Sequence, residues 1–269
     1  GHTGPVLGVA CDGAGYGPDG AVWGGEFLIA DLCRFRRAAH LKYVPQPGGD
    51  AAAGQPWRMT AAHLYHACGN AFRNWDFAFN HSLNHSDWTT LRRMMDRGLN
   101  TPSTSSMGRL FDAVSALCGF PHREMAHQGQ AAADLEFLCG DASAADPYPF
   151  EYLEPRTPDA PLRINPAPLI RSVVCDLQND ESAQTISARF HAAVAHMITD
   201  ICVKIRRAGG PDTVAMSGGV FQNRVLLDLA ATRLENRGFR VLTHAHVPPG
   251  DGGISLGQAA VAAATIKSE

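Results

Sequence analysis

The N-terminal end of the chain carries a run of apolar residues with little polar alternation. Residues 5–11 form this run, which is typical of a buried β-strand. Residues 12–20 then contain four glycines, a proline and two aspartates, a composition that favours a turn. Aromatic and β-branched residues predict two further strands over residues 21–30 and 32–40. The chain is therefore expected to open with a strand, a glycine-rich turn and two more strands.

The middle of the chain changes to apolar residues at helical spacing. A long helix is predicted for residues 182–207, where Ile186, Phe190 and Val194 begin an apolar face. The segment 141–168 is rich in Pro, Asp and Ala and predicts an irregular, partly extended connection. Four earlier helices are predicted over residues 57–72, 86–98, 105–117 and 130–139, and the stretch from about 45 to 100 has the character of a helical insertion.

The last third of the chain has an alternating strand and helix pattern. Strands are predicted over residues 213–216 and 239–244, and each is followed by glycines and a helix, over 220–236 and 254–267. This order implies parallel strands. Together with the first three strands it predicts a mixed five-stranded sheet with helices on its faces.

Composition and charge exclude several classes of protein. The 269 residues are 45% hydrophobic and 18% charged, which excludes a disordered chain. The formal net charge is -3 and no basic stripe is present, so general binding to nucleic acid is not expected. The apolar runs are far shorter than a membrane span, and the first residues lack a basic-then-apolar pattern, so neither membrane insertion nor secretion is expected.

The seven cysteines show no CxxC spacing, which argues against a disulfide framework and against a cysteine zinc knuckle. Most lie among apolar residues, so reduced core thiols and a cytoplasmic location are predicted.

Three glycine-rich turns follow predicted strands and are the candidates for chemistry. In the first, Asp12 precedes Gly13 and Gly15, so backbone N–H groups could approach an anion without obstruction by a Cβ atom. An ordinary β-hairpin loop explains the same glycines. Because parallel strands end at one edge of a sheet, the three turns together favour a ligand site there.

The second and third turns are each expected to open a helix. Ser217, Gly218 and Gly219 would place free N–H groups and the positive end of a helix dipole near Asn223. Asp251 in the third turn could offer a carboxylate to a cation. Simple helix capping by Ser217 and by Asp251 is the alternative in both cases.

Other candidates for chemistry are weaker. His81 and His85 are four residues apart and His63 and His66 three apart, but neither pair has the ligand pattern of a zinc site. Surface or core histidines explain both pairs. No serine or cysteine nucleophile can be assigned from spacing.

Six separated motifs, in order, resemble the C-terminal part of the hydrogenase maturation carbamoyltransferases of the HypF family. These are residues 12–17 (DGAGYG), 24–26 (GGE), 47–50 (PGGD), 105–114 (SSMGRLFDAV), 217–224 (SGGVFQNR) and 251–258 (DGGISLGQ). The resemblance extends over nearly the whole chain. It implies the second, RNase H-like lobe of an actin/Hsp70/sugar-kinase (ASKHA) fold, with residues 1–269 forming that single lobe.

The resemblance also implies an activity. Members of this family make carbamoyl-adenylate from carbamoyl phosphate and ATP, and pass the carbamoyl group to the C-terminal cysteine of HypE. The group becomes the precursor of a cyanide ligand in [NiFe]-hydrogenase.

Site residues follow from the same resemblance. Asp12 and Asp251 would be ligands of a divalent metal, with magnesium, iron and zinc left open. The nucleotide would contact Gly13, Ala14 and Gly15 at its phosphates, Asp112 and Gly129 at its ribose, and Ser217, Gly218, Gly219 and Asn223 elsewhere.

The chain departs from the family pattern at Ala14, Gln128 and Gly250, where the family has Thr, Glu and Asn. In the family a histidine-rich metal motif precedes the first glycine loop, and that motif and the first lobe are absent from this sequence. The chain alone is therefore expected to bind nucleotide weakly and not to turn over. The alternatives are a small-molecule O-carbamoyltransferase and a noncatalytic module that binds nucleotide or a maturation partner.

Overall fold

The computed structural model describes residues 2, 4–120, 123–155, 157 and 160–268. The strands are β1 (Val6–Tyr16), β2 (Val22–Ala30), β3 (Phe35–Leu41), β4 (Val44–Pro45), β5 (Ser103–Thr104), β6 (Glu151–Leu153), β7 (Leu162–Asn165), β8 (Thr213–Ser217) and β9 (Arg240–Leu242). The α-helices are α1 (Asp50–Gly54), α2 (Pro56–Cys68), α3 (Ala78–Ser82), α4 (His85–Arg97), α5 (Met107–Leu117), α6 (Gln130–Leu138), α7 (Ala167–Gln178), α8 (Ala183–Arg207), α9 (Arg224–Asn236) and α10 (Ile254–Ser268). The 3-10 helices of the described residues are η1 (Gly69–Asn74), η2 (Gly219–Gln222) and η3 (Asp251–Gly253).

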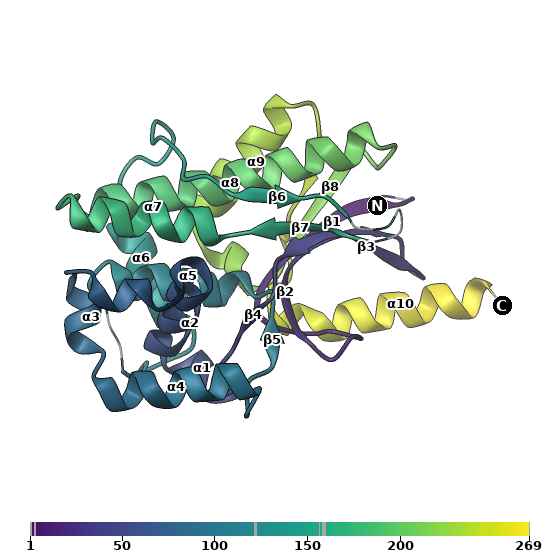
Figure 1. Cartoon of the computed structure of the whole chain (residues 1–269). Helices are drawn as coiled ribbons and strands as arrows, with labels where there is room; N and C mark the ends of the chain where they lie inside the picture. Colours follow the sequence, from purple (N-terminus) through teal and green to yellow (C-terminus); the bar gives the residue numbers. More distant parts are fainter. Residues whose placement is uncertain (1, 3, 121–122, 156, 158–159, 269) are drawn as a thin grey trace.

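One mixed sheet organises the molecule (Figure 1). Its main path runs β6-β7-β3-β2-β1-β8-β9, and β4 and β5 pair beside β2. The five predicted strands form the stretch β3-β2-β1-β8-β9, with β1 to β3 antiparallel and β8 and β9 parallel to β1. The sheet is wider than predicted because β7 and β6 extend it beyond β3. Both strands come from the segment expected to be an irregular connection.

The first strand is also longer than predicted. β1 continues through the glycine-rich motif to Tyr16, with a register shift against β2 between Cys11 and Gly15. The turn itself lies at residues 17–20, where the Gly20 N–H donates to the Gly17 carbonyl. The pairing of β1 with β2 continues on both sides of this shift because Gly24 of β2 has no side chain: a Cβ there would lie 2.5 Å from the Asp12 carbonyl oxygen.

Helices surround the sheet. Figure 1 shows α7, α8 and α9 along one side of it and α1 to α5 gathered at one end. α8 carries the predicted apolar face, which is buried from Ile186 through Phe190 and Val194 to Cys202. α7 was not predicted, although Leu169, Ile170, Val173 and Val174 give it a buried face. Prolines 166 and 168 obscured its start in the sequence.

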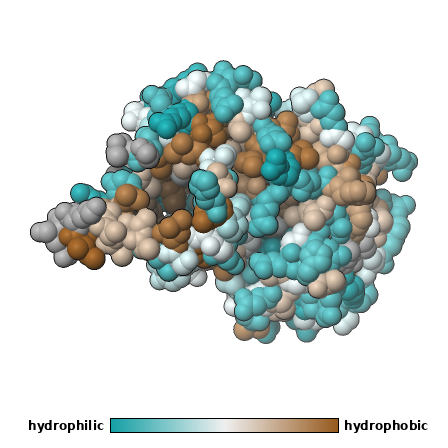
Figure 2. Space-filling view, turned by 180° about the vertical axis from the view of Figure 1, so that it is seen from behind, coloured by the Kyte–Doolittle hydropathy of each residue, from teal (hydrophilic) through white to brown (hydrophobic). Residues whose placement is uncertain are grey.

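The last helix, α10, packs differently from the others. It projects from the body of the molecule, and Figure 2 shows apolar side chains along the projection. Ile254, Leu256, Val261 and Ile266 are between 46% and 74% exposed. Within the described residues, no helix combines the length and hydrophobicity needed to cross a membrane.

The cysteines are all free thiols. Cys11, Cys118 and Cys202 are buried as predicted, and burial raises the pKa of the Cys118 thiol to about 12. Cys33 and Cys175 are exposed, so the prediction of core thiols is wrong for these two.

Candidate functional site

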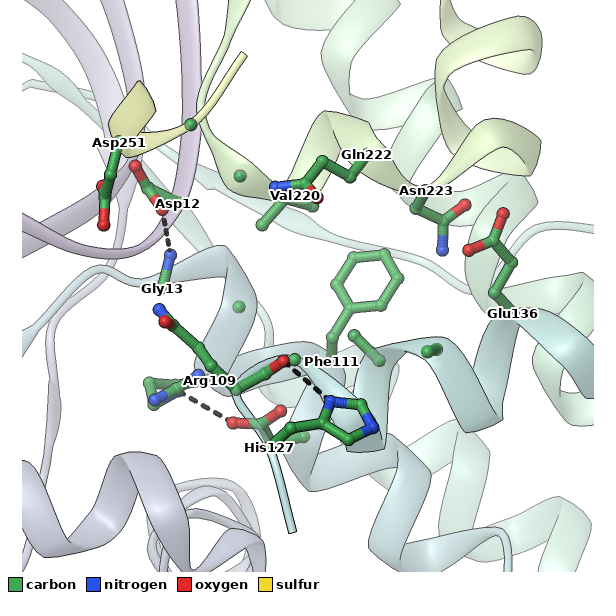
Figure 3. Close-up of a pocket in the computed structure, with 18 of the residues that line it drawn as sticks. Asp12, Gly13, Arg109, Phe111, His127, Glu136, Val220, Gln222, Asn223 and Asp251 are labelled. Atoms are coloured by element: carbon green, nitrogen blue, oxygen red, sulfur yellow. Dashed lines mark hydrogen bonds and ion pairs between the residues drawn. The ribbon is translucent and has the colours of Figure 1, made fainter. Parts of the chain in front are cut away.

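A cavity opens at the carboxyl end of β8, beside the glycine-rich part of β1. Ala10 of β1 is paired with Ser217, the last residue of β8, so Asp12 and Gly13 lie beside the residues that follow β8. The cavity has a volume of about 560 Å³ and is walled by the end of β1, the first turns of α5 and α6, η2 and the η3 loop (Figure 3). A pocket at the carboxyl ends of parallel strands is where α/β proteins bind ligands.

Two carboxylates lie at one end of this cavity. Asp12 and Asp251 come from β1 and η3, more than 200 residues apart in the sequence, and Figure 3 shows them next to each other. Burial raises the pKa of Asp12, and the negative charge of Asp251 acts in the same direction. The N–H groups of Gly13 and Gly219 oppose this rise, and Gly13 donates to Asp12 Oδ1 at 2.7 Å.

These two carboxylates fit a hard divalent cation as a partial ligand set. No group of three or more His, Cys, Asp or Glu side chains among the described residues is arranged to hold a metal. Mg²⁺ is commonly held by one or two carboxylates, with substrate phosphates and water completing the shell. The site therefore matches a cation that arrives with a phosphorylated ligand.

A close backbone contact forms the floor beside these carboxylates. Gly218 has φ of +104°, and a Cβ atom there would lie 2.0 Å from the Cys11 carbonyl oxygen. Its N–H donates to the Pro249 carbonyl at 2.8 Å, which ties the η3 loop to β8. Glycine is required here because any side chain would push β1 and β8 apart.

The start of α5 is tied to the first glycine loop. Ser106 caps this helix by accepting from the Arg109 N–H at 3.1 Å. The same hydroxyl lies 2.8 Å from the carbonyl oxygens of both Asp12 and Gly13 and donates to this pair. Gly108 permits the approach, since a Cβ atom on it would lie 2.8 Å from the Gly13 Cα atom.

A buried ion pair on α5 faces the cavity. Arg109 Nε lies 2.8 Å from Asp112 Oδ2, and both side chains are less than 10% exposed. Burial raises the pKa of Asp112 to about 6, while the guanidinium of Arg109 acts in the opposite direction. Both atoms are buried, and among the described residues neither has a partner in hydrogen-bonding geometry. The ion pair therefore joins these two side chains of α5 at the cavity wall.

The far end of the cavity carries an amide and a carboxylate. Asn223 caps α9, and its Oδ1 accepts from the Leu226 N–H at 2.8 Å. Glu136 of α6 reaches the same helix end, where its Oε1 accepts from the N–H groups of Arg224 and Val225 at 2.7 and 3.4 Å. Figure 3 shows both side chains at the end of the cavity away from Asp12.

These contacts correct one expectation about the second glycine turn. Residues 217–219 do not open the predicted helix directly, because η2 intervenes and α9 begins at Arg224. The first N–H groups of α9 are occupied by Asn223 and Glu136. At the turn itself, the Gly218 N–H donates to the Pro249 carbonyl and the Gly219 N–H is bonded to the Asp12 carboxylate.

Most of the residues singled out in the sequence line the cavity. These are Asp12, Gly13, Asp112, Gly129, Gly219, Asn223 and Asp251. Four others do not line it. Ala14 and Gly15 lie farther along β1, outside the cavity. The Ser217 hydroxyl is directed elsewhere, with its Oγ 3.2 Å from His244 Nε2. Gly218 packs against the Cys11 backbone.

Sequence reasoning missed several lining residues. Gly108 and Arg109 lay within a recognised motif without an assigned role, whereas Glu136 had no signal. A lone glutamate on a helix becomes notable only once α9 is placed against it.

Comparison with known proteins now decides the family. The family described as "Carbamoyltransferase, Kae1-like Domain, second subdomain" matches residues 8–258. The chain belongs to this family. The resemblance to HypF and the predicted fold class, a mixed sheet with flanking helices, are thereby confirmed, and the architecture is consistent with an ASKHA-like lobe.

Similar proteins cover the chain almost completely. The carbamoyltransferase HypF of Rhodobacter capsulatus is 37% identical over 98% of this chain, and a HypF homolog of Cupriavidus necator is 35% identical over 96%. The match covers 33% of the first protein and 65% of the second. The chain thus spans about a third of the length of the full HypF relatives.

Solved structures agree with this assignment. Full-length HypF in a phosphate- and nucleotide-bound form matches with a TM-score of 0.89 and 38% identity, over 96% of this chain and 39% of that one. HypF of T. kodakarensis matches over 98% of this chain and 35% of that one, with a TM-score of 0.74 and 24% identity, which supports the fold.

Proposed function

We propose that this HypF-type chain forms the nucleotide-binding second lobe of an ATP-dependent carbamoyltransferase. The observation that carries the proposal is the convergence of Asp12, Gly219 and Asp251 at one end of a cavity of about 560 Å³. Cavities of roughly 300–1,000 Å³ hold ligands of nucleotide size. The nucleotide-bound state of a HypF that is 38% identical supports ATP as the ligand.

The polarity of the cavity suggests how ATP lies in it. In this proposal the phosphates would lie near Asp12 and Asp251, which would hold a divalent cation, and the N–H groups of Gly13 and Gly219 would orient the Asp12 carboxylate. The nucleoside then extends toward Asp112, Gly129 and Asn223. Ala14, Gly15, Ser217 and Gly218 shape the backbone around the phosphates.

A divalent metal at this end would be held by Asp12 and Asp251. When bound, it would neutralise phosphate charge and polarise a phosphoryl oxygen. The carboxylate oxygens suit magnesium and also iron or zinc. Further ligands would come from the nucleotide or from the first lobe of the same protein.

The complete enzyme is proposed to act in the cytoplasm: carbamoyl phosphate would lose inorganic phosphate to give carbamate, which would attack the α-phosphate of ATP and release pyrophosphate, forming carbamoyl-adenylate. The carbamoyl group would then pass to the C-terminal cysteine of a HypE-like protein for cyanide ligand synthesis in [NiFe]-hydrogenase maturation. In this scheme Arg109 and Asp112 line the wall beside the nucleotide. Asp12 and Ser106 hold the loop that positions the phosphates.

Calorimetric titration with ATP and Mg²⁺ tests the binding step. Asp12→Asn and Asp251→Asn should each weaken Mg²⁺-dependent ATP binding by about tenfold or more, because each removes a charged ligand. Asp228→Asn is the matched control, since Asp228 is exposed on α9 and lies outside this cavity. Unchanged affinity in both site variants would contradict the proposal.

A turnover assay tests whether this lobe suffices. The chain alone is expected to show no exchange of pyrophosphate into ATP that depends on carbamoyl phosphate, because the first lobe would complete the active site. Full exchange activity by residues 1–269 would show that the first lobe is unnecessary.

A further inference from the structure

A buried histidine contacts Asn223, which lines the end of the cavity away from Asp12. His191, in the middle of α8, has no exposed surface. Its Nδ1 lies 2.8 Å from the Ser187 carbonyl oxygen, which can only accept a hydrogen bond. Nδ1 therefore carries the proton, and Nε2 of the neutral ring is an acceptor.

That tautomer determines the orientation of Asn223. The Asn223 Nδ2 lies 2.9 Å from His191 Nε2 and must donate to it. The Asn223 Oδ1 accepts a hydrogen bond from the Leu226 N–H. A flipped amide would place oxygen against an acceptor and NH₂ against a donor, so the flip is disfavoured at both ends.

In the part of the chain that the structure describes, the second hydrogen atom of this amide has no hydrogen-bond acceptor. Asn223 lines the cavity, its oxygen is used in the helix cap, and one of its two N–H bonds is used by His191. Asn223 therefore meets a ligand as a donor. The matching group on the nucleoside is a hydrogen-bond acceptor, either a ring nitrogen of the base or a ribose oxygen.

The packing around His191 holds the ring in place. The ring lies edge-on to Phe111 at 5.5 Å and to Phe190 at 5.9 Å between centroids. Burial lowers the pKa of His191 to about 4, which keeps the ring neutral, while its hydrogen bond to the Ser187 carbonyl acts in the opposite direction. The histidine thus has a single tautomer and a single orientation.

We propose that His191 is a positioning residue that orients the Asn223 amide so that its free N–H donates to an acceptor atom of the bound nucleoside. This inference rests on the proposed nucleotide site and adds the direction of one hydrogen bond in it. His191 itself does not line the cavity.

Three variants test the arrangement by ATP titration in the presence of Mg²⁺. His191→Leu removes the acceptor and should weaken binding about tenfold, whereas His191→Gln offers an oxygen near the position of Nε2 and should restore most of the affinity. Asn223→Asp keeps the helix cap but removes the donor, and should weaken binding at least as much. His63→Phe, at a buried histidine of α2 outside the cavity, is the control and should bind as wild type.

Nucleotide analogues identify the acceptor. Deaza-adenosine triphosphates that lack one ring nitrogen, and 2′- and 3′-deoxy-ATP, each remove one candidate atom. The analogue that lacks the partner of Asn223 should bind wild type weakly and lose nothing further in Asn223→Asp. If all analogues lose affinity in that variant to the same extent as ATP, the donor role is wrong.

Nitrogen-15 NMR of the histidine rings provides a readout independent of binding. The expected spectrum shows His191 protonated at Nδ1 and an Asn223 side-chain amide signal that shifts in His191→Leu and much less in His191→Gln. A ring protonated at Nε2 would overturn the inference. Wild-type protein that does not bind ATP would refute the proposed site, whereas ATP binding that is equal in wild type and His191→Leu would refute only the role of His191.

Discussion

At the residue scale, Gly218 is the position with the least room for change. Its φ of +104° is unfavourable for any side chain, and a Cβ atom would meet the Cys11 backbone at 2.0 Å. The substitution Gly218→Ala should therefore lower the free energy of unfolding by about 3 kcal/mol or more. Urea denaturation followed by circular dichroism would measure it.

Gly209 supplies the control for this prediction. It also has a positive φ, of +90°, but nothing lies within 4 Å of a Cβ built there. Gly209→Ala should therefore cost only the backbone strain, about 1–2 kcal/mol. Equal losses in the two variants would show that the contact with Cys11 carries no extra cost.

Two buried histidines should make stability depend on pH. Burial lowers the pKa of His63 to about 3 and that of His191 to about 4, from 6.5 in an unfolded chain. Below pH 6.5 the unfolded chain binds protons that the folded chain does not, so stability falls as the pH falls. Each histidine should contribute a loss of about 1.4 kcal/mol per pH unit until its folded pKa is reached.

The variant His191→Gln isolates one of these contributions. Asp112, whose pKa burial raises to about 6, binds a proton in the folded state and acts in the opposite direction below that pH. The difference between variant and wild type cancels this effect. Urea unfolding at pH 7, 6 and 5 should show a flatter dependence in His191→Gln, and parallel curves would contradict the role of His191.

At the element scale, α9 depends on a carboxylate from another helix. Glu136 of α6 accepts from the N–H groups of Arg224 and Val225, so its negative charge lies at the positive end of the α9 dipole. Glu136→Ala should lower the free energy of unfolding by about 1 kcal/mol, and Glu136→Gln by less because an acceptor remains. Urea denaturation would compare them.

Glu235 is the matched control for Glu136. It is exposed near the opposite end of the same helix, where a negative charge is not favoured. Glu235→Ala should leave stability unchanged or raise it slightly. A loss equal to that of Glu136→Ala would show that the effect of Glu136 does not come from the helix end.

At the scale of the whole molecule, α10 stands apart from the cooperative core. Its apolar side chains are exposed, and an isolated helix of this length is only marginally stable in water. Its amide hydrogens should exchange orders of magnitude faster than those of α8, which buries one face along its length. Hydrogen–deuterium exchange with mass spectrometry measures both helices in one experiment.

Removing residues 254–269 should consequently cost less than about 1 kcal/mol of stability. Protection of α10 equal to that of α8, or a large loss on truncation, would show that the helix is held by the body of the lobe.

The predictability of the fold from the sequence differed between regions. Strong local periodicity predicted α8, and a glycine-rich break marked the end of β8, because these signals depend only on neighbours in the chain. The glycines after Cys11 did not mark the end of β1, which continues through them to Tyr16. The sequence did not predict α7, and over β6 and β7 it predicted only an irregular, partly extended connection. These two strands are three and four residues long and acquire their structure by pairing at the edge beyond β3.

The candidate site divides in the same way. Asp12, Asn223 and Asp251 could be singled out because each accompanies a glycine-rich motif, and the cavity contains all three. Their roles toward metal and nucleotide stay predictions. Glu136 and His191 carried no usable signal, since each acquires its importance from a partner on another helix.

The sequence alone determined the family, the five central strands and the glycines on which the site is built. These depend on local patterning and on backbone conformations that only glycine adopts at low cost. Only the tertiary structure decided that the sheet extends through β7 to β6, that Glu136 accepts from N–H groups at the start of α9, and that the Asn223 amide meets the His191 ring. Hydrogen bonds between residues 30 to 90 positions apart exist only after packing brings their elements together, so no local pattern encodes them.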